Sequence, residues 1–357
     1  MDAVKAWFQR YFSDPQVVFL AISLLVGLLL VVWFGNLMAP VIASVILAYL
    51  LEGLVRQMEL WRIPRLAAVT LVFLIFLALL FFLIVAVVPV LVRQVTQLVQ
   101  QMPIMIDEGQ RLLETLPEQY PMIFSEDQLQ QFMAGIGDEV TLFRQEVLSR
   151  TLSFGVGLLT FMVYVVLMPI LVFFMLKDKH AILAWFGRYL PSNRGLAAQV
   201  WTEVDEQVGN YVRGKIWEII LVWVVTYITF SLLGLEYAML MAALTGFSVL
   251  IPYIGATVVT VPVAAVAYFQ FGLTSEFAYI LIAYGVIQFI DGNILVPILF
   301  SEVVNLHPVA IIVAILFFGG IWGFWGIFFA IPLATLVQAV LRAWPRQDRP
   351  PEPDAAG

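Results

Sequence analysis

A single aspartate in a long stretch without basic residues is the residue best suited to chemistry. Asp291 stands between Gln288 and Asn293, inside residues 216–341, which contain no lysine or arginine. A carboxylate inside a membrane segment is costly to bury and commonly marks a path for protons, ions or solutes. We expect Asp291, with Gln288 and Asn293 beside it, to contact a solute or bind a coupling ion, and to be the only carboxylate within a span. The alternative is a protonated or hydrogen-bonded Asp291 that only holds its segment near Pro297.

Two apolar stretches, residues 237–271 and 309–341, have lengths that suit neither one membrane crossing nor two. As a single helix the first would extend about 52 Å, well beyond a bilayer core of about 30 Å. Each stretch is broken, the first at IPYIG (251–255) and the second at GGIWGFWG (319–326). We therefore expect two re-entrant helical hairpins, related as a weak internal repeat.

Breaks of this kind leave backbone N–H and C=O groups without helical partners. Lipid cannot satisfy such groups, so a broken helix persists in a membrane only inside the protein or beside a wet cavity. Paired broken helices are also typical of transporter substrate sites. The alternative is that the glycines only let helices pack closely, as Gly319 and Gly323 would in a GxxxG contact. The residues that we predict to bind substrate at the two tips are Pro252, Tyr253, Gly255, Gly319, Gly320 and Gly323.

A histidine provides a second candidate for ion coupling. His307 could change its charge near neutral pH, as an unperturbed histidine does. Its position directly before Pro308 also fits a residue that begins a helix, and this alternative stays open. The other histidine, His180, lies far away in the sequence, so we expect no histidine-based metal site and no cofactor.

Two patterns imitate enzyme motifs. Gly209, Gly214 and Lys215 have the spacing of a phosphate-binding loop, but Ile216 occupies the position that requires Ser or Thr. The sequence GFS at 246–248 is similar to a serine intramembrane protease motif, but the glycine that should follow is missing. We therefore expect neither nucleotide binding nor enzyme activity.

The composition excludes an ordinary soluble protein. Of the 357 residues 62% are hydrophobic and only 12% are charged, against about 25% charged in soluble domains. The apolar runs reach the length of about 20 residues that a membrane-crossing helix needs. The absence of cysteine excludes disulfides and thiolate metal sites, and the net charge of −7 argues against a nucleic-acid partner. We expect membrane lipid to surround most of the chain.

The positions of the basic residues indicate the orientation in the membrane. Fourteen of the 18 lie in the amino-terminal stretch, the loop before Leu66, residues 177–215 and the tail, whereas residues 93–150 carry a net charge of −5. Basic loops stay on the cytoplasmic side. We therefore predict a multi-pass protein of the bacterial inner membrane, with both termini in the cytoplasm and residues 93–150 outside it.

These features predict an all-α polytopic membrane protein with about eight membrane segments, including the two re-entrant hairpins. The first two spans are expected at residues 17–35 and 37–54, with a tight turn at Asn36. The expected domains are an amino-terminal region with three spans (1–92), an extracytoplasmic amphipathic helical segment broken at Pro103, Pro117 and Pro121 (93–150), a fourth span with cytoplasmic interfacial helices (151–215), a transport core with both hairpins (216–341) and a disordered cytoplasmic tail (342–357).

Several strings along the chain resemble one known family. They are AP at 39–40, AYLL at 48–51, FFMLKD at 173–178, YVRGK at 211–215, GFSVLIPYIG at 246–255, DGN at 291–293 with Pro297, and FSEVVNLHP at 300–308. On these strings the chain resembles the autoinducer-2 exporter (AI-2E) superfamily over nearly its whole length. It departs from the family pattern at Lys215, where many members have glutamine, and at Ser301, near which they have glycine.

The resemblance implies a homo-oligomer, a pentamer, in which each protomer works by an elevator-type movement around two helical hairpins. The substrates that it implies are autoinducer-2 and, for some members, sodium or lithium exchanged for protons. We therefore expect a secondary transporter, a permease, that exports a small polar molecule. The alternatives are a sodium or lithium/proton antiporter and a membrane scaffold that transports nothing.

Overall fold

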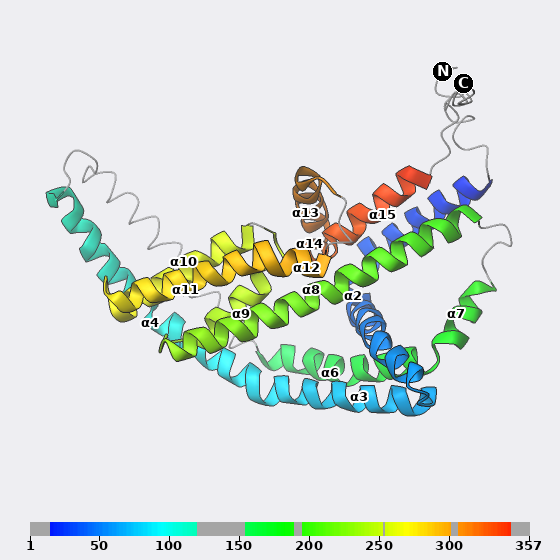
Figure 1. The fold of residues 1–357 in the computed structure, drawn as a ribbon, viewed down its shortest axis with the longest axis horizontal. Coiled ribbons are helices and arrows are strands. Elements are labelled where there is room, and N and C mark those ends of the chain that lie inside the picture. The colour runs from blue at the N-terminus through cyan, green and yellow to red at the C-terminus, as the bar shows by residue number, and fades with distance from the viewer. Residues whose placement is uncertain (1–14, 120–153, 189–194, 253, 301–305, 344–357) are drawn as a thin grey trace, which may run out of the picture. The chain divides into compact units, whose positions relative to one another are not determined.

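The architecture is helical. A computed structural model of the chain describes residues 15–119, 154–188, 195–252, 254–300 and 306–343. Every regular element in these ranges is a helix (Figure 1), which confirms the predicted all-α class. The helices are α2 (Pro15–Leu60), α3 (Arg65–Phe82), η1 (Leu83–Val87), α4 (Val88–Gln119), α6 (Phe154–Lys177), α7 (Lys179–Gly187), α8 (Gly195–Leu232), α9 (Ala238–Ser248), α10 (Ile254–Phe271), α11 (Ser275–Ile290), η2 (Asp291–Leu295), α12 (Val296–Phe300), α13 (Pro308–Trp322), α14 (Phe324–Phe328) and α15 (Ala330–Ala343).

The described part of the chain contains five helices that are long and apolar enough to cross a membrane. A sixth candidate is the pair of helices α6 and α7, which meet at a bend of 77°. The sequence predicted about eight membrane segments, and the two that are not among these candidates are residues 17–35 and the second hairpin, whose apolar helices are shorter. The five candidate spans are Pro40–Leu60, Arg65–Gly109, Gln207–Leu232, Ile254–Phe271 and Ser275–Phe300, and the shorter apolar helices are Ala238–Ser248, Pro308–Trp322 and Ala330–Val340.

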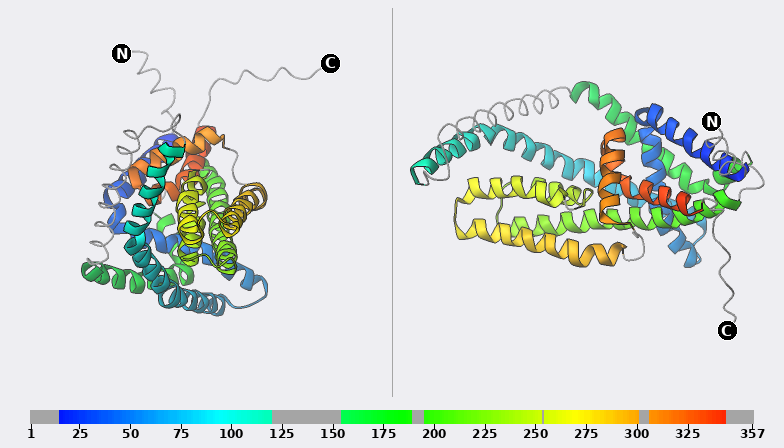
Figure 2. Two further views of the ribbon diagram at one scale, coloured as in Figure 1. Left: turned by 90° about the vertical axis from the view of Figure 1, so that its left-hand side faces the viewer. Right: turned by 90° about the horizontal axis from the view of Figure 1, so that it is seen from above.

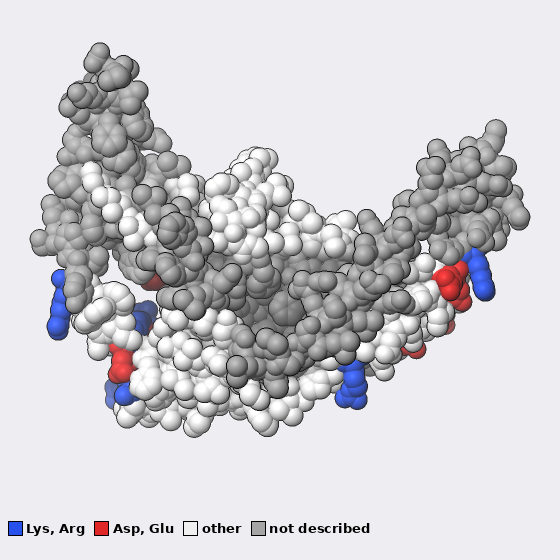
Figure 3. All heavy atoms as spheres, turned by 180° about the vertical axis from the view of Figure 1, so that it is seen from behind, with Lys and Arg blue, Asp and Glu red and all other residues white. Residues whose placement is uncertain are grey.

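The described surface is largely apolar. On the face drawn in Figure 3, charged side chains are few, and most of the described surface carries no charge. Large hydrophobic side chains such as Leu74 and Phe81 are 55% and 68% exposed. A soluble protein rarely leaves so much apolar surface in water. The surface therefore agrees with a multi-pass protein surrounded by lipid.

The predicted turn at Asn36 is wrong. Helix α2 continues from Pro15 to Leu60 through both Asn36 and Pro40. Asparagine is only a weak helix breaker, so one such residue does not end an apolar helix. Figure 1 shows α2 changing direction partway along, and a proline inside a helix is an ordinary cause of such a bend.

Two more helices continue through positions where the sequence predicted a boundary or a break. Helix α8 continues through Lys215, where the sequence predicted a change from an interfacial helix to a span. Helix α4 continues through Pro103 and Pro117 to Gln119. Packing supports the first part of α4, because Leu91, Val95 and Leu98 lie against a buried cluster of other helices. The rest of the predicted segment, residues 120–150, and the tail from 344 lie outside the described residues.

Contacts divide the chain into two units, each built from several segments. Unit one comprises Met1–Val69, Leu171–Glu218 and Gly292–Gly357. Unit two comprises Thr70–Ile170 and Ile219–Asp291. The first hairpin, α9–α10, therefore belongs to unit two, and the second, α13–α15, belongs to unit one.

Unit one holds a network of charged side chains at the ends of α2 and α6. Arg65 forms an ion pair with Glu52 at 3.1 Å and donates a hydrogen bond to the Leu176 carbonyl at 2.9 Å. Lys179 pairs with the same Glu52 carboxylate at 3.1 Å. The network joins two basic stretches that the charge distribution assigned to one side of the membrane.

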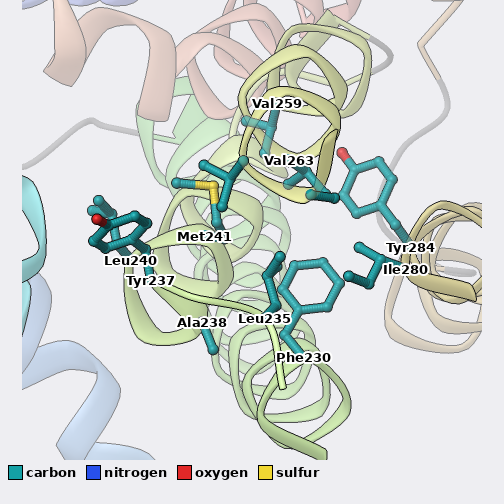
Figure 4. Packing of buried hydrophobic residues seen from close by; sticks show 12 residues of the cluster. Phe230, Leu235, Tyr237, Ala238, Leu240, Met241, Val259, Val263, Ile280 and Tyr284 are labelled. Atoms are coloured by element: carbon teal, nitrogen blue, oxygen red, sulfur yellow. The ribbon is translucent and has the colours of Figure 1, made fainter. Parts of the chain in front are cut away.

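Unit two is built around a cluster of twelve buried side chains from α8, α9, α10, α11 and the loop before α9. In Figure 4 the Phe230 ring lies beside Ile280 and Tyr284, while Val259 and Val263 enter from α10. Phe230 and Ile280 are fully buried. Helices α10 and α11 lie alongside each other (Figure 2). The cluster fixes the first hairpin against its neighbours.

Two turns of π-helix, Leu83–Val87 and Asp291–Leu295, interrupt the long apolar helices. Each ends two residues before a proline, Pro89 or Pro297. A proline ring in a helix clashes with the carbonyl four residues earlier and removes one N–H donor. For Pro297 that carbonyl belongs to Asn293, the middle residue of its π turn. The wide turn is therefore a local consequence of the sequence, and turns of this kind are frequent at functional sites.

Candidate functional site

The tip of the first hairpin is a tight turn between α9 and α10. The Gly255 N–H donates to the Ile251 carbonyl at 2.9 Å, and the Ile254 N–H donates to the Pro252 carbonyl at 2.7 Å. A Cβ atom on Gly255 would overlap the Ser248 carbonyl oxygen and lie 2.6 Å from the carbonyl carbon. Glycine is required here because the two backbones touch. Tyr253, the other predicted tip residue, lies outside the described residues.

The opposite end of this hairpin is held by two glutamines. Gln270 of α10 donates to the Gly234 carbonyl at 2.8 Å and accepts from the Glu236 N–H at 2.7 Å. Gln94 of α4 accepts a hydrogen bond from the Leu240 N–H at 2.8 Å. Leu240 lies in the first turn of α9, where the N–H groups have no partner within the helix. Both glutamines therefore satisfy backbone groups at the base of the hairpin.

One face of α11 leads from the buried cluster to the predicted aspartate. Ile280, Tyr284, Ile287 and Asp291 recur at helical spacing and are all buried, with Asp291 7% exposed. The Tyr284 hydroxyl donates to the Ala256 carbonyl at 2.7 Å, in the first turn of α10. This bond ties the α11 face to the hairpin tip.

The predicted polar residues lie just beyond that bond. Gln288 is half-buried and lies one helical turn after Tyr284, on the same side of α11. The loop at 272–274 joins α10 to α11. Counted in residues from this loop, Gly255 lies as far back along α10 as Asp291 lies forward at the end of α11. Both residues therefore lie at the end of the helix pair that is opposite the loop. Unit two thus brings the first tip, Gln288 and Asp291 to one end, whereas Asn293, in the π turn, is exposed.

The second hairpin closes in a similar way within unit one. Helix α13 ends at Trp322, and Gly323 follows with a φ of 58°, which glycine adopts without strain. A Cβ atom on Gly326 would overlap the Phe318 carbonyl oxygen, and one on Gly319 would lie 2.9 Å from Cγ1 of Ile327. A Cβ atom on Gly320 would meet no atom within 4 Å. Gly320 is therefore the predicted tip glycine for which neither packing nor backbone conformation requires glycine.

His307 begins α13. Its Nδ1 accepts a hydrogen bond from the Val309 N–H at 3.3 Å, and Pro308 occupies the first helical position. This is the arrangement of an N-terminal cap, in which a side chain satisfies a free backbone N–H. The alternative of a helix-start residue is confirmed, and a coupling role for His307 stays a prediction.

A buried ion pair in α8 was not predicted. Lys215 and Glu218 lie 2.7 Å apart, with side chains only 5% and 2% exposed. Both belong to the candidate span Gln207–Leu232, so the expectation that Asp291 would be the only carboxylate within a span is wrong. The signal was in the sequence, because residues three apart lie on the same helix face. The pairing compensates both charges, which explains how Lys215 and Glu218 can be buried in α8.

Aromatic rings surround this pair. The Lys215 ammonium lies 5.2 Å from the centre of the Phe300 ring, and that ring lies 5.7 Å from the ring of Tyr211. A Cβ atom on Gly214 would lie 2.8 Å from the Phe300 ring. Because Gly214 has no side chain, the ring of Phe300, the last residue of α12, can pack against α8. A cation over an aromatic face gains further electrostatic stabilisation.

The two enzyme-like patterns have structural explanations. Gly209 lies against the ring of Tyr49, whose hydroxyl donates to the Asp205 carbonyl at 2.8 Å. Gly246 faces Trp223 of α8, where a Cβ atom would lie 2.8 Å from Cβ of Trp223. The Ser248 hydroxyl donates to the Thr245 carbonyl at 2.7 Å, within its own helix. These glycines thus allow helices to pack, and the serine is engaged with its backbone.

Comparison with known proteins agrees with the resemblance seen in the sequence. The family model for AI-2E family transporters matches residues 20–346. The chain is 44% identical to "Putative permease PerM" of Escherichia coli strain K12, over 97% of this chain and 98% of that protein. It is 26% identical to "Putative transport protein YueF" of Bacillus subtilis strain 168, over 87% and 84% of the two chains. It is 23% identical to "AI-2 transport protein TqsA" of Escherichia coli strain K12, over 90% and 92%.

Proposed function

The chain belongs to the AI-2E transporter family, and from this membership we propose that it is a secondary transporter that exports a small polar molecule. The similarity to a protein named for AI-2 transport supports a solute of the autoinducer-2 type. The family resemblance also supports a homo-pentamer, and the distribution of basic residues supports an inner-membrane protein with both termini in the cytoplasm. An elevator-type movement of each protomer around its two hairpins completes the proposal.

One observation carries this function. The first hairpin and α11 place a broken helix and a buried carboxylate, Asp291, at the same end of a packed helix pair. Broken helices expose hydrogen-bonding groups where a solute can bind, and buried carboxylates in spans commonly serve protons, ions or substrates. The proposed contacts are Pro252, Tyr253, Gly255, Gln288, Asp291, Asn293, Gly319, Gly320 and Gly323, with Asp291 and His307 as the coupling groups.

Replacing Asp291→Asn tests the proposal in proteoliposomes that hold the purified protein. The matched control is Glu276→Gln, because Glu276 lies on the same helix, α11, with a fully exposed side chain. We expect Asp291→Asn to remove the dependence of solute export on a proton gradient, and Glu276→Gln to leave it unchanged. Equal rates and equal proton dependence in both variants would exclude Asp291 from the mechanism.

A second candidate function is exchange of sodium or lithium for protons. The specific observation that favours it is a second buried carboxylate inside a candidate span, Glu218, in addition to the buried Asp291. In vesicles without any organic solute, an antiporter dissipates a pH gradient when sodium is added, whereas a solute exporter does not. The double variant Lys215→Gln with Glu218→Gln keeps the net charge of the site and separates the role of this pair from that of Asp291.

A further inference from the structure

Helix α7 leaves the end of α6 at a steep angle. The two helices are bent by 77° at Asp178. If α6 crosses the bilayer close to the membrane normal, a helix at this angle lies nearly in the plane of the membrane surface. The nine residues of α7 are too few to cross a bilayer core of about 30 Å. The geometry therefore gives α7 the orientation of an interfacial helix.

The large apolar side chains of α7 are about half exposed. None of the residues Lys179–Gly187 is buried. Leu183, Trp185 and Phe186 are 55%, 52% and 58% exposed. The rings of Trp185 and Phe186 pack edge to face with centroids 4.9 Å apart, so they form one aromatic surface. Tryptophan is enriched where a membrane meets water, because its ring is apolar and its N–H is polar.

Basic residues lie at both ends of α7 and on the turn between α2 and α3. Lys177 and Arg188 are exposed at the two ends. Trp61 and Arg62 lie on the turn, where Arg62 has a φ of 65° and Trp61 is 67% exposed. The left-handed backbone of Arg62 makes the turn tight, and its N–H donates to the Glu59 carbonyl at 2.9 Å.

The charge network of unit one connects this turn to α7. Arg65, three residues after Arg62, donates to the carbonyl of Leu176 at the end of α6. Lys179, the first residue of α7, pairs with Glu52. Glu52 and Glu59 are therefore paired with Arg65 and Lys179. Lys177 lies 4.0 Å from the Asp178 carboxylate, and this one acid is outnumbered by the exposed Arg62, Lys177 and Arg188, so the edge keeps a positive character.

We propose that α7 and the Trp61–Arg62 turn form a binding surface for the headgroups of anionic phospholipids. Trp61, Trp185 and Phe186 enter the interface, and Arg62, Lys177 and Arg188 meet the lipid phosphates. The mixture of exposed aromatic rings and cations on a helix nearly perpendicular to a span favours lipid over a second protein chain. The surface adds a partner that the transport function does not require.

Lipid binding to the full-length protein, measured by native mass spectrometry, tests this proposal. The probes are phosphatidylglycerol and, as the uncharged reference, phosphatidylcholine. We expect the wild type to prefer phosphatidylglycerol, and the triple variant Arg62→Ala, Lys177→Ala and Arg188→Ala to bind it about 100-fold more weakly, since each basic residue contributes about fivefold. The control variant Arg93→Ala with Arg111→Ala removes exposed arginines of α4 and should keep the wild-type affinity. An equal loss, or no loss, in both variants overturns the proposal.

Tryptophan fluorescence gives a second, independent readout. The difference between the wild type and Trp185→Phe isolates the signal of Trp185 in bilayers that contain brominated lipids. We expect quenching by lipids brominated close to the headgroup and little quenching by lipids brominated near the chain end. Absence of quenching, together with a change in oligomer mass in Trp185→Arg, would assign this surface to a second copy of the chain and overturn the proposal.

Discussion

The two hairpins, α9–α10 and α13–α15, close with the same kind of backbone contact. In the first, Gly255 touches the carbonyl of Ser248, and in the second, Gly326 touches the carbonyl of Phe318. A side chain at either glycine would overlap the facing carbonyl oxygen. The weak sequence repeat therefore corresponds to a shared way of turning one helix back onto another.

The hairpins differ in what surrounds them. Eight of the eleven residues of α9 are buried, and α10 adds to the same cluster. In α13 the buried residues described are Ala314 and Ile315, whereas Leu316 and Phe317 are 68% and 61% exposed. The two turns are similar, but the first hairpin is packed within its own unit, whereas the second exposes apolar side chains that lipid or another chain can contact. The difference makes the first hairpin the more firmly packed of the two.

Truncating a buried side chain should show this difference most strongly. Met241 in α9 is fully buried, so Met241→Ala should lower the free energy of unfolding by about 3 kcal/mol through lost contacts and a cavity. Leu316→Ala in the second hairpin should change it by less than about 0.5 kcal/mol, because an exposed side chain leaves no cavity. Denaturation of the purified protein in detergent measures both. Similar losses would mean that α13 is as firmly packed as α9.

The closing glycines provide the next test. Gly255→Ala should cost about 2 kcal/mol, because its Cβ atom would overlap a backbone carbonyl in a packed core. Gly326→Ala meets a similar overlap but should cost less, since α13 has more room to shift. The control is Gly285→Ala in α11, where no atom lies within 4 Å and the helix should gain up to about 1 kcal/mol. A larger loss at Gly326 than at Gly255 would reverse the comparison.

Of these substitutions that lower stability, replacing Gln270 at the base of the first hairpin should lower the free energy of unfolding least. Gln270→Leu removes two hydrogen bonds to the loop before α9, and water can replace them at this exposed position. The expected loss is about 1 kcal/mol. Gln101→Leu on the exposed side of α4 is the matched control. Faster hydrogen exchange at residues 234–240 in Gln270→Leu alone would locate the effect, and equal exchange in both variants would contradict it.

Much of the fold could be predicted because apolar periodicity and length report on membrane helices. The breaks near residues 251–255 and 319–326 were predicted because the apolar runs are too long for one crossing and contain sequences rich in proline or glycine. The continuity of α2 through Asn36 could not be predicted, because tolerance of a weak breaker depends on the rest of the helix. Likewise, Pro103 leaves α4 intact, with Leu91, Val95 and Leu98 packed against other helices.

The candidate site was predictable in part. Asp291 was predicted as a site residue because it is a carboxylate in an apolar stretch, and the structure shows it buried. Its role in binding or coupling stays a prediction. The Lys215–Glu218 pair was missed because Lys215 was taken as the end of a cytoplasmic segment, although the spacing of three residues allowed the pairing. The role of Gly255 depends on the Ser248 carbonyl, a contact across the turn that no local pattern specifies.

The central claim is that Gln288 and the residues around Asp291 face water inside the membrane rather than lipid. The chain has no cysteine, so single cysteine variants can be labelled without background. The measurement is the reaction rate of Gln288→Cys, Asn293→Cys and Ile282→Cys with a charged, membrane-impermeant thiosulfonate reagent, in protein embedded in a bilayer. Thiols react as thiolates, which require water.

We expect Gln288→Cys and Asn293→Cys to react quickly and to be protected by a transported solute. Ile282→Cys, on the exposed apolar side of α11, should stay unlabelled because lipid excludes the reagent. If Gln288→Cys and Asn293→Cys were as unreactive as Ile282→Cys, α11 would have no wet face beside Asp291, and the proposed transport site would be contradicted.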